Sequence, residues 1–158
     1  MVCAIFGAAV MLFLGKRLPK AAVSFLCPGT VFVSLVFSVG AVMQLASSPN
    51  KVHEVITYLW LPSLNADWGF LLDPLSSVMI LVVTGIGFLI HVFASWYMRG
   101  EEGYSRFFTY TNLFIASMVV LGLAGSLVFL YLGWEGVGIC SYLLIGFYYR
   151  TVANGNAA

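Results

Sequence analysis

The feature that most constrains the fold is a run of 26 residues, 21–46, in which no side chain carries a charge. A helix needs about 20 apolar residues to cross the hydrocarbon core of a bilayer, so this run can span it with some tilt. The whole chain of 158 residues is 61% hydrophobic and only 8% charged. Because a soluble domain carries about 25% charged residues, the sequence predicts an integral membrane protein.

The apolar segments predict an all-α protein in which residues 1–158 form a single transmembrane region. The first segment is short for a core of roughly 30 Å. In the second, Pro28 either kinks the helix or marks its true start. Asp73 and Pro74 are typical of a helix start, with aspartate as the N-cap and proline in the first turn. We expect about five spans, at residues 2–15, 21–46, 74–97, 107–124 and 127–149.

Residues 52–72 separate the second span from the third. Two segments rich in β-branched and aromatic residues, 55–61 and 68–72, flank a stretch of turn-forming residues, 62–67. This pattern predicts a β-hairpin lying on one face of the membrane. The aromatic residues expected at the membrane interface are Tyr58, Trp60 and Trp68.

The basic residues predict the orientation of the spans. With five spans, all but one of them fall on the same side: Lys16, Arg17, Lys20, Arg99, Arg106 and Arg150. Only Lys51 falls on the other side. The positive-inside rule then places the loops 15–20 and 98–106 in the cytoplasm and the hairpin outside it.

Glu135 is the residue on which a functional interpretation depends. It is the only charged residue in the stretch 126–149. A bare charge at the centre of a membrane helix costs about 2.5 kcal/mol or more, and such acids are functional by default. A site whose surroundings alternate between apolar and positively charged would bind and release a proton. The alternative is a static acid that is paired for structure. Residues expected on the same helical face are Tyr131, Gly138, Ile139 and Tyr142.

Other polar residues give weaker signals. His91 lies in the third span and is a candidate proton relay because imidazole titrates near neutral pH. We favour a histidine that is hydrogen-bonded near the interface. The three cysteines, Cys3, Cys27 and Cys140, lack the paired spacing of a metal site and are interpreted as small buried residues. We expect no metal site, and the absence of a basic patch argues against nucleic-acid binding.

Two segments carry a resemblance: FLIHVFASWYMRGEEGYSRFF (88–108) and LGWEGVGICSYLLIGF (132–147). They closely resemble the subunit L family of bacterial respiratory NADH:quinone oxidoreductase (complex I), whose mitochondrial counterpart is subunit 5. The resemblance extends from about Trp68 to the last residue. It implies an antiporter-like membrane subunit that couples quinone reduction elsewhere in the complex to proton transfer. Glu135 matches the family's conserved glutamate of the fifth span, which partners a lysine on the seventh.

The resemblance also implies the setting of the chain. NADH, FMN, iron–sulfur clusters and quinone would bind to other subunits, so no cofactor is expected in this chain. Its partners would be the other membrane-arm subunits, the lipid bilayer and protons. The expected location is the bacterial cytoplasmic (inner) membrane, crossed several times.

The sequence departs from the family in length. Members have well over a dozen spans in two inverted five-helix repeats, whereas this chain reaches only the first helix of the first repeat. It therefore resembles an N-terminal fragment with an incomplete antiporter-like domain, which is not expected to translocate protons alone. Two alternatives stay open: the large subunit of a multisubunit cation/proton antiporter, and a small structural membrane protein.

Overall fold

The computed structural model describes residues 2–15, 19–49, 52–61, 66–149 and 155–156. Within these ranges the chain forms five α-helices, one antiparallel hairpin and a short 3₁₀ turn. The helices are α1 (Val2–Leu14), α2 (Lys20–Ser47), α3 (Pro74–Tyr97), α4 (Tyr104–Leu123) and α5 (Leu127–Ile145). The strands are β1 (His53–Leu61) and β2 (Ala66–Leu72), and the 3₁₀ turn is Gly146–Tyr148.

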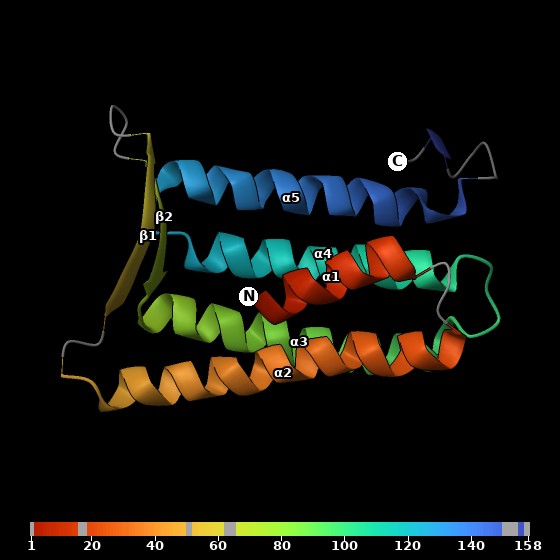
Figure 1. Cartoon of the computed structure of the whole chain (residues 1–158), viewed down its shortest axis with the longest axis horizontal. Helices are drawn as coiled ribbons and strands as arrows, with labels where there is room; N and C mark the ends of the chain where they lie inside the picture. Colours follow the sequence, from red (N-terminus) through yellow and green to blue (C-terminus); the bar gives the residue numbers. More distant parts are fainter. Residues whose placement is uncertain (1, 16–18, 50–51, 62–65, 150–154, 157–158) are drawn as a thin grey trace.

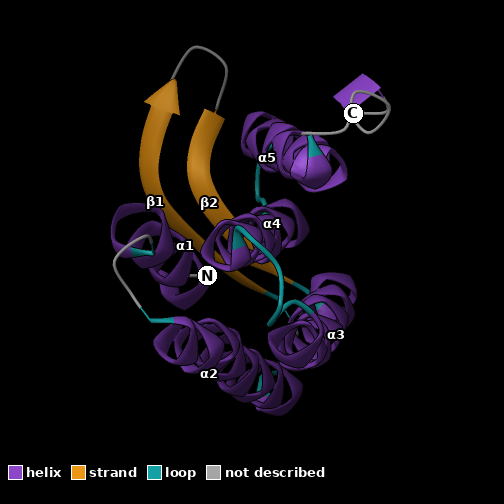
Figure 2. Cartoon of the chain, turned by 90° about the vertical axis from the view of Figure 1, so that its right-hand side faces the viewer, coloured by secondary structure: helices purple, strands orange, loops and turns teal. Residues whose placement is uncertain are grey.

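The five helices lie side by side, and the hairpin stands across one end of the bundle (Figure 1). Viewed along the bundle, α4 occupies the centre, with α1, α3 and α5 packed around it (Figure 2). The helix α2 closes the bundle between α1 and α3. The predicted bundle of membrane helices is therefore confirmed, with α4 as the element that holds the others together.

Four of the helical segments are long and apolar enough to cross a membrane: Lys20–Ser47, Pro74–Tyr97, Tyr104–Leu123 and Leu127–Tyr148. The helix α1 has 13 residues, which gives it a length of about 20 Å. It is therefore shorter than the roughly 30 Å hydrocarbon core, as its sequence indicated. The described chain thus supports a multi-pass membrane protein with four full spans and one short helix.

Two helix boundaries differ from the predictions. The helix α2 runs without a break through Pro28, which is buried, so a start near Pro28 is wrong. Membrane helices tolerate an internal proline when neighbouring helices cover the disturbed backbone. The helix α4 begins at Tyr104 rather than Phe107, because Gly103 adopts a left-handed conformation with φ of 88° and reverses the chain just before it.

The predicted hairpin is confirmed between α2 and α3. Its antiparallel register pairs His53 with Leu72 and Val55 with Phe70. The predicted turn lies partly in residues 62–65, outside the described residues, as do the side chains of Tyr58 and Trp60. The backbone N–H of Gly125 donates to the carbonyl of Gly69 at 2.9 Å, which ties the hairpin to the α4–α5 turn.

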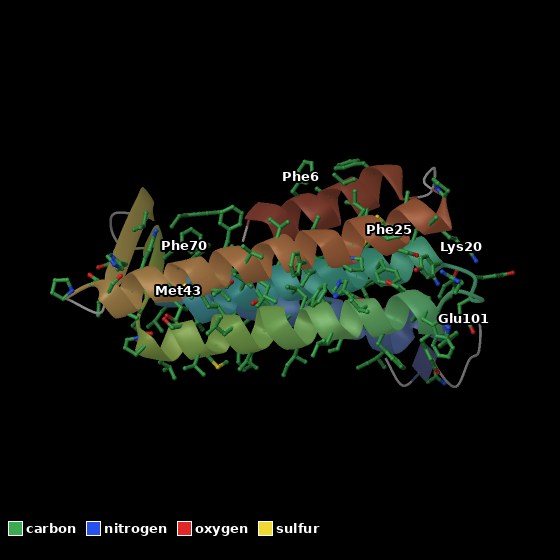
Figure 3. The ribbon with its side chains drawn as sticks, turned by 90° about the horizontal axis from the view of Figure 1, so that it is seen from below. Phe6, Lys20, Phe25, Met43, Phe70 and Glu101 are labelled. Atoms are coloured by element: carbon green, nitrogen blue, oxygen red, sulfur yellow. The ribbon has the colours of Figure 1, made fainter. Side chains whose placement is uncertain are left out.

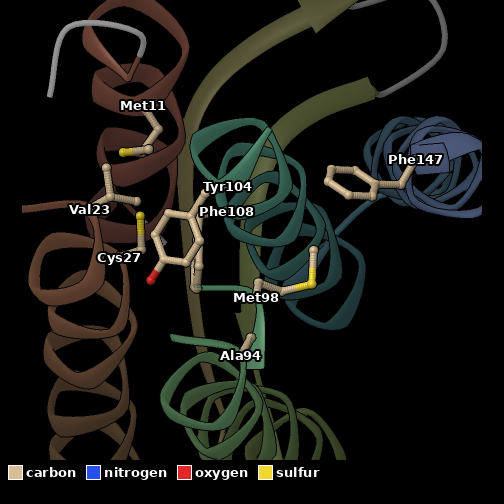
Figure 4. Packing of buried hydrophobic residues seen from close by; sticks show 8 residues of the cluster. All are labelled: Met11, Val23, Cys27, Ala94, Met98, Tyr104, Phe108 and Phe147. Atoms are coloured by element: carbon tan, nitrogen blue, oxygen red, sulfur yellow. The ribbon is translucent and has the colours of Figure 1, made fainter. Parts of the chain in front are cut away.

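The larger of the two buried hydrophobic clusters among the described residues lies where α1 and α3 end and α2 and α4 begin (Figure 4). Its centre is Phe108 of α4, which is fully buried and packs against the Tyr104 ring at 4.9 Å between ring centroids. Residues from α1 to α4, the residue that follows α3 and the 3₁₀ turn contribute to the cluster: Met11, Val23, Cys27, Ala94, Met98, Tyr104, Phe108 and Phe147. Cys27 and Cys140 are buried as expected, and the side chain of Cys3 lies outside the described residues.

Asp73 caps the first turn of α3, as its sequence predicted. The backbone N–H of Ser76 donates to Asp73 Oδ1 at 2.7 Å, and the N–H of Asp73 donates to Ser76 Oγ at 2.8 Å. This reciprocal capping box satisfies two backbone donors that the helix itself leaves unpaired. The hydrogen bonds from Ser76 hold the pKa of the Asp73 carboxyl below its usual value.

Replacing Asp73 with alanine should lower the free energy of unfolding by about 1 kcal/mol, because the cap is lost. Asp73→Asn should retain most of the cap, since asparagine is as good an N-cap as aspartate. The depressed pKa adds a pH dependence with a definite sign: its stabilisation is present above the ordinary aspartate pKa and is lost as pH falls through the folded pKa. Thermal unfolding in detergent at neutral and acidic pH measures both effects. Equal acid sensitivity of the wild type and Asp73→Asn would contradict this assignment.

Candidate functional site

The helix α5 carries the candidate site and is fixed at both ends. At its start, the backbone N–H of Phe129 donates to Ser126 Oγ at 3.4 Å. The Phe129 ring lies 5.2 Å from that of Phe70 in β2, measured between centroids. At its far end, Nη2 of Arg106 donates to the carbonyl of Phe147 at 3.2 Å. These contacts set both the height and the rotation of α5 in the bundle.

One face of α5 packs closely against α4. A methyl group added at Gly133 would lie 2.7 Å from the backbone nitrogen of Leu121, and one added at Gly136 would lie 2.6 Å from Ser117 Oγ. One turn further, the buried thiol of Cys140 forms a hydrogen bond with Ser117. Gly133 and Gly136 therefore let α5 approach α4 closely. A methyl group at Gly138 would meet nothing within 4 Å.

The opposite face of α5 carries Glu135 and is exposed. Tyr131 and Tyr142, one turn before and two turns after it, are 62% and 59% exposed. The Tyr131 side chain lies close enough to that of Glu135 to interact with it. The neighbouring helix α4 has no charged residue after Arg106, so it has no cation to offer the acid. The predicted face is thus assembled by the fold, and the chain's own described helices leave it uncovered.

Glu135 lies near the middle of its span. By the rise of 1.5 Å per residue, it is about 12 Å along the axis from Leu127 and about 15 Å from Ile145. This position is far from the water on either side of a bilayer whose hydrocarbon core is roughly 30 Å thick. The group therefore meets the condition under which an intramembrane carboxyl needs a partner, a proton or a function.

His91 is buried inside the bundle and hydrogen-bonded. Its side chain has no exposed surface, and its Nδ1 lies 2.7 Å from the carbonyl oxygen of Gly87, one turn earlier in α3. Its ring packs against Phe108 at 5.9 Å between centroids. Its Nε2 is buried without a hydrogen-bond partner in the part of the chain that the structure describes. The structure does not bring His91 and Glu135 together, because α4 lies between α3 and α5.

A buried polar cluster between α2 and α4 escaped the sequence reasoning. Asn112 is fully buried, and its Nδ2 donates to the carbonyl of Phe108 at 3.2 Å. The Thr30 hydroxyl donates to Asn112 Oδ1 at 3.2 Å and lies 2.9 Å from the carbonyl of Cys27, whose thiol also bonds to Asn112. An uncharged amide within an apolar span was the available signal, because such residues join membrane helices by hydrogen bonds.

Other candidate residues do not form a site. Among the residues that the structure describes, no group of three or more His, Cys, Asp or Glu side chains could hold a metal ion. His53 and Glu54 are exposed in β1, and Glu101 is exposed in the turn after α3. Among the described residues, Glu135 is the one acidic side chain that lies within a helix.

Apolar spans around one central carboxyl define the class: a multi-pass membrane protein with a candidate ion-transfer site. Two family models match the sequence. One is described as "NADH-Ubiquinone oxidoreductase (complex I), chain 5 N-terminus" and matches residues 59–108. The other is described as "NADH:quinone oxidoreductase/Mrp antiporter, TM" and matches residues 124–158, which include Glu135.

Curated relatives carry concordant names. NADH-quinone oxidoreductase subunit L of Pseudomonas aeruginosa is 54% identical over 134 residues, covering 82% of this chain and 22% of the relative. Subunit L of Escherichia coli is 67% identical over 102 residues, covering 65% of this chain and 17% of the relative. The chloroplastic NAD(P)H-quinone oxidoreductase subunit 5 of Zygnema circumcarinatum is 37% identical over 121 residues, covering 77% of this chain and 17% of the relative.

The chain belongs to the subunit L family of NADH:quinone oxidoreductase. It spans about a fifth of the length of the curated relatives it matches. This coverage is consistent with the expected correspondence to the N-terminal part of a longer subunit.

The close approach of α5 to α4 gives a prediction for stability. Gly133→Ala places a methyl group against the backbone of Leu121, and such overpacking costs about 1–3 kcal/mol. Gly40→Ala is the matched control, because an added methyl group there meets nothing within 4 Å. The midpoint of thermal unfolding in detergent should fall for Gly133→Ala and not for Gly40→Ala. Equal midpoints for the two variants would show that α5 does not pack on α4 through Gly133.

Proposed function

We propose that this chain forms part of an antiporter-like, proton-translocating membrane subunit of NADH:quinone oxidoreductase, in which proton transfer is coupled to quinone reduction. The observation that carries the proposal is the position of Glu135, in the middle of a span and on a face that the described helices leave open. The names of the relatives support the assignment to this enzyme complex.

In the proposed mechanism, Glu135 binds a proton while its surroundings are apolar and releases it when a cation comes close. Tyr131, which lies beside the carboxyl, helps to orient it, and Tyr142 extends the polar face along the helix. The cation is a lysine from a later segment of the longer subunit, as the family resemblance implies. The open face of α5 is where that segment would pack.

The proposed orientation in the membrane follows from the charges at the two ends of the bundle. Lys20 lies at the end opposite Phe70 of the hairpin (Figure 3). The positive-inside rule assigns the Lys20 end to the cytoplasm of a bacterium and the hairpin to the outside of its inner membrane. In this proposal, NADH, FMN, iron–sulfur clusters and quinone bind to other subunits, and the partners are the membrane-arm subunits and lipid.

A multisubunit cation/proton antiporter is the second candidate function. The description of the family matched by residues 124–158 names this class together with the oxidoreductase. The two candidates share the proton site and differ in what drives it. Neighbouring genes for redox subunits would support the oxidoreductase, whereas neighbouring antiporter genes would favour the second candidate.

Replacing Glu135 with glutamine in the full-length protein tests the proton site. The change keeps the volume of the side chain and removes its titration. We expect assembled complex with normal electron transfer from NADH to a soluble acceptor, but with reduced quinone reduction and reduced proton pumping. Proton uptake and quinone reduction in reconstituted vesicles provide the measurement.

Glu101→Gln is the matched control for this experiment. It makes the same chemical change at an exposed residue of the α3–α4 turn. The control should pump protons at the wild-type rate. Wild-type pumping by Glu135→Gln would refute the proton site, whereas loss of assembly in Glu135→Gln alone would assign the residue to structure.

His91 is proposed to hold α3 against α4, with proton relay as the alternative. Its bond to Gly87 and its contact with Phe108 support the structural role. We expect His91→Ala to lower the thermal unfolding midpoint by opening a cavity. His91→Gln should stay stable and pump protons normally. Lost pumping at unchanged stability in His91→Gln would assign the residue to the proton route.

A further inference from the structure

An open apolar groove runs along the outer surface between α2 and α3. It has a volume of about 450 Å³ and lies between residues 24–32 of α2 and 88–95 of α3. The rings of Phe32 and Phe88, 5.2 Å apart between centroids, adjoin at one end of the groove. Phe25, which is 82% exposed, stands on the α2 side near the end of the bundle that carries Lys20 (Figure 3).

The groove owes its depth to one missing side chain. A methyl group added at Gly29 would meet nothing within 4 Å, so the space beside this residue is open. The groove also offers little to a polar ligand. Its two serines use their hydroxyls internally, because Ser24 donates to the carbonyl of Lys20 and Ser95 donates to the carbonyl of His91, each one turn earlier. The wall therefore suits a hydrocarbon chain.

Two basic residues lie at the mouth of the groove, beside a turn that also carries Glu101 and Glu102. Lys20, at the start of α2, donates from Nζ to the backbone carbonyl of Arg99, just past the end of α3, at 3.1 Å. This bond holds the ammonium between the two helices that form the groove. An ammonium has three donors, so two remain for another acceptor. Arg99 is exposed and adds a second positive charge at the same end.

The distance between the Lys20 ammonium and the apolar groove fits the shape of a phospholipid. By helical rise, Ser24 lies about 6 Å and Phe32 about 18 Å along the axis from Lys20, so the groove extends from below the ammonium toward the middle of the membrane. A phospholipid has the same order, a phosphate at the surface and an acyl chain beneath it. Basic pockets between helices near the membrane surface bind anionic head groups.

We propose that the α2–α3 groove binds an anionic phospholipid, with its phosphate at Lys20 and one acyl chain along Gly29. The site is separate from Glu135, which lies on α5, and it does not depend on the proposed proton transfer. It requires that the chain spans a membrane and that, in the longer subunit, this outer face of α2 and α3 borders lipid.

The test uses the full-length protein in its complex, reconstituted into vesicles that contain a photoreactive phosphatidylglycerol with the label in its acyl chain. Crosslinks are mapped by mass spectrometry. We expect labelling at residues 24–32 and 88–95, competed by unlabelled phosphatidylglycerol more strongly than by phosphatidylcholine. Gly29→Leu should abolish the labelling by filling the groove, and Gly40→Leu, where the added group also meets nothing within 4 Å, should not.

A separate variant tests the contribution of the Lys20 charge at the mouth of the groove. Lys20→Gln should reduce the preference for phosphatidylglycerol over phosphatidylcholine about fivefold, which corresponds to about 1 kcal/mol per basic residue near an anionic surface. Thermal unfolding identifies any variant that fails to fold. In that case, competition between the two unlabelled lipids on the wild-type protein still measures the lipid preference. Equal competition by the two lipids, unchanged labelling in Gly29→Leu, or no labelling at residues 24–32 and 88–95 would each overturn the proposal.

Discussion

The close contact between α5 and α4 sets the geometry of the candidate site. At Gly133 the backbones of the two helices approach so nearly that even a methyl group would collide with Leu121. Successive residues of a helix are rotated by about 100°, so Glu135, two residues later, is turned by about 200° from Gly133. Packing of the glycine face therefore sends the carboxyl to the far side of the helix. The glycines of α5 therefore have two effects: they permit its close packing on α4, and they fix the direction in which Glu135 points.

Buried polar groups elsewhere in the bundle show what a structural role looks like in this protein. Asn112, Thr30 and Cys27 satisfy one another across the α2–α4 contact, and His91 bonds to the backbone of its own helix. Such groups join helices because their alternative is an unpaired dipole in hydrocarbon. Glu135 differs, because among the described helices its neighbour α4 carries nothing that could neutralise it. That contrast within one bundle supports function at Glu135.

The sequence predicted those features that depend on local chemistry. Uncharged runs identified the helices, the alternation of turn-forming and β-branched residues identified the hairpin, and Asp73 with Pro74 identified the start of α3. The sequence failed where neighbouring elements decide the outcome. Pro28 was expected either to kink a helix or to begin one; it does not begin one, since it lies inside α2, against which α1 and α3 pack.

The candidate site was also predictable only where it depends on local spacing along one helix. Helical spacing placed Tyr131, Gly138 and Tyr142 on the face of Glu135, and the structure has them there. Spacing alone did not tell which glycines would contact a neighbour, because Gly133 and Gly138 look alike in sequence. Only the position of α4 separates them. The same holds for His91, whose burial depends on α3 and α4 meeting at Phe108.

The anchoring of α5 bears on how a proton site there could switch. Its start is held by the hairpin through Gly69 and Phe70, and its end is held by Arg106 through Phe147. Its packed face is fixed by the contact at Gly133. A helix restrained at both ends and along one side has little freedom to rotate or slide. In the proposed mechanism, where Glu135 alternates between apolar and charged surroundings, the movement would therefore occur in the segment proposed to pack on its open face, while α5 holds the carboxyl in place.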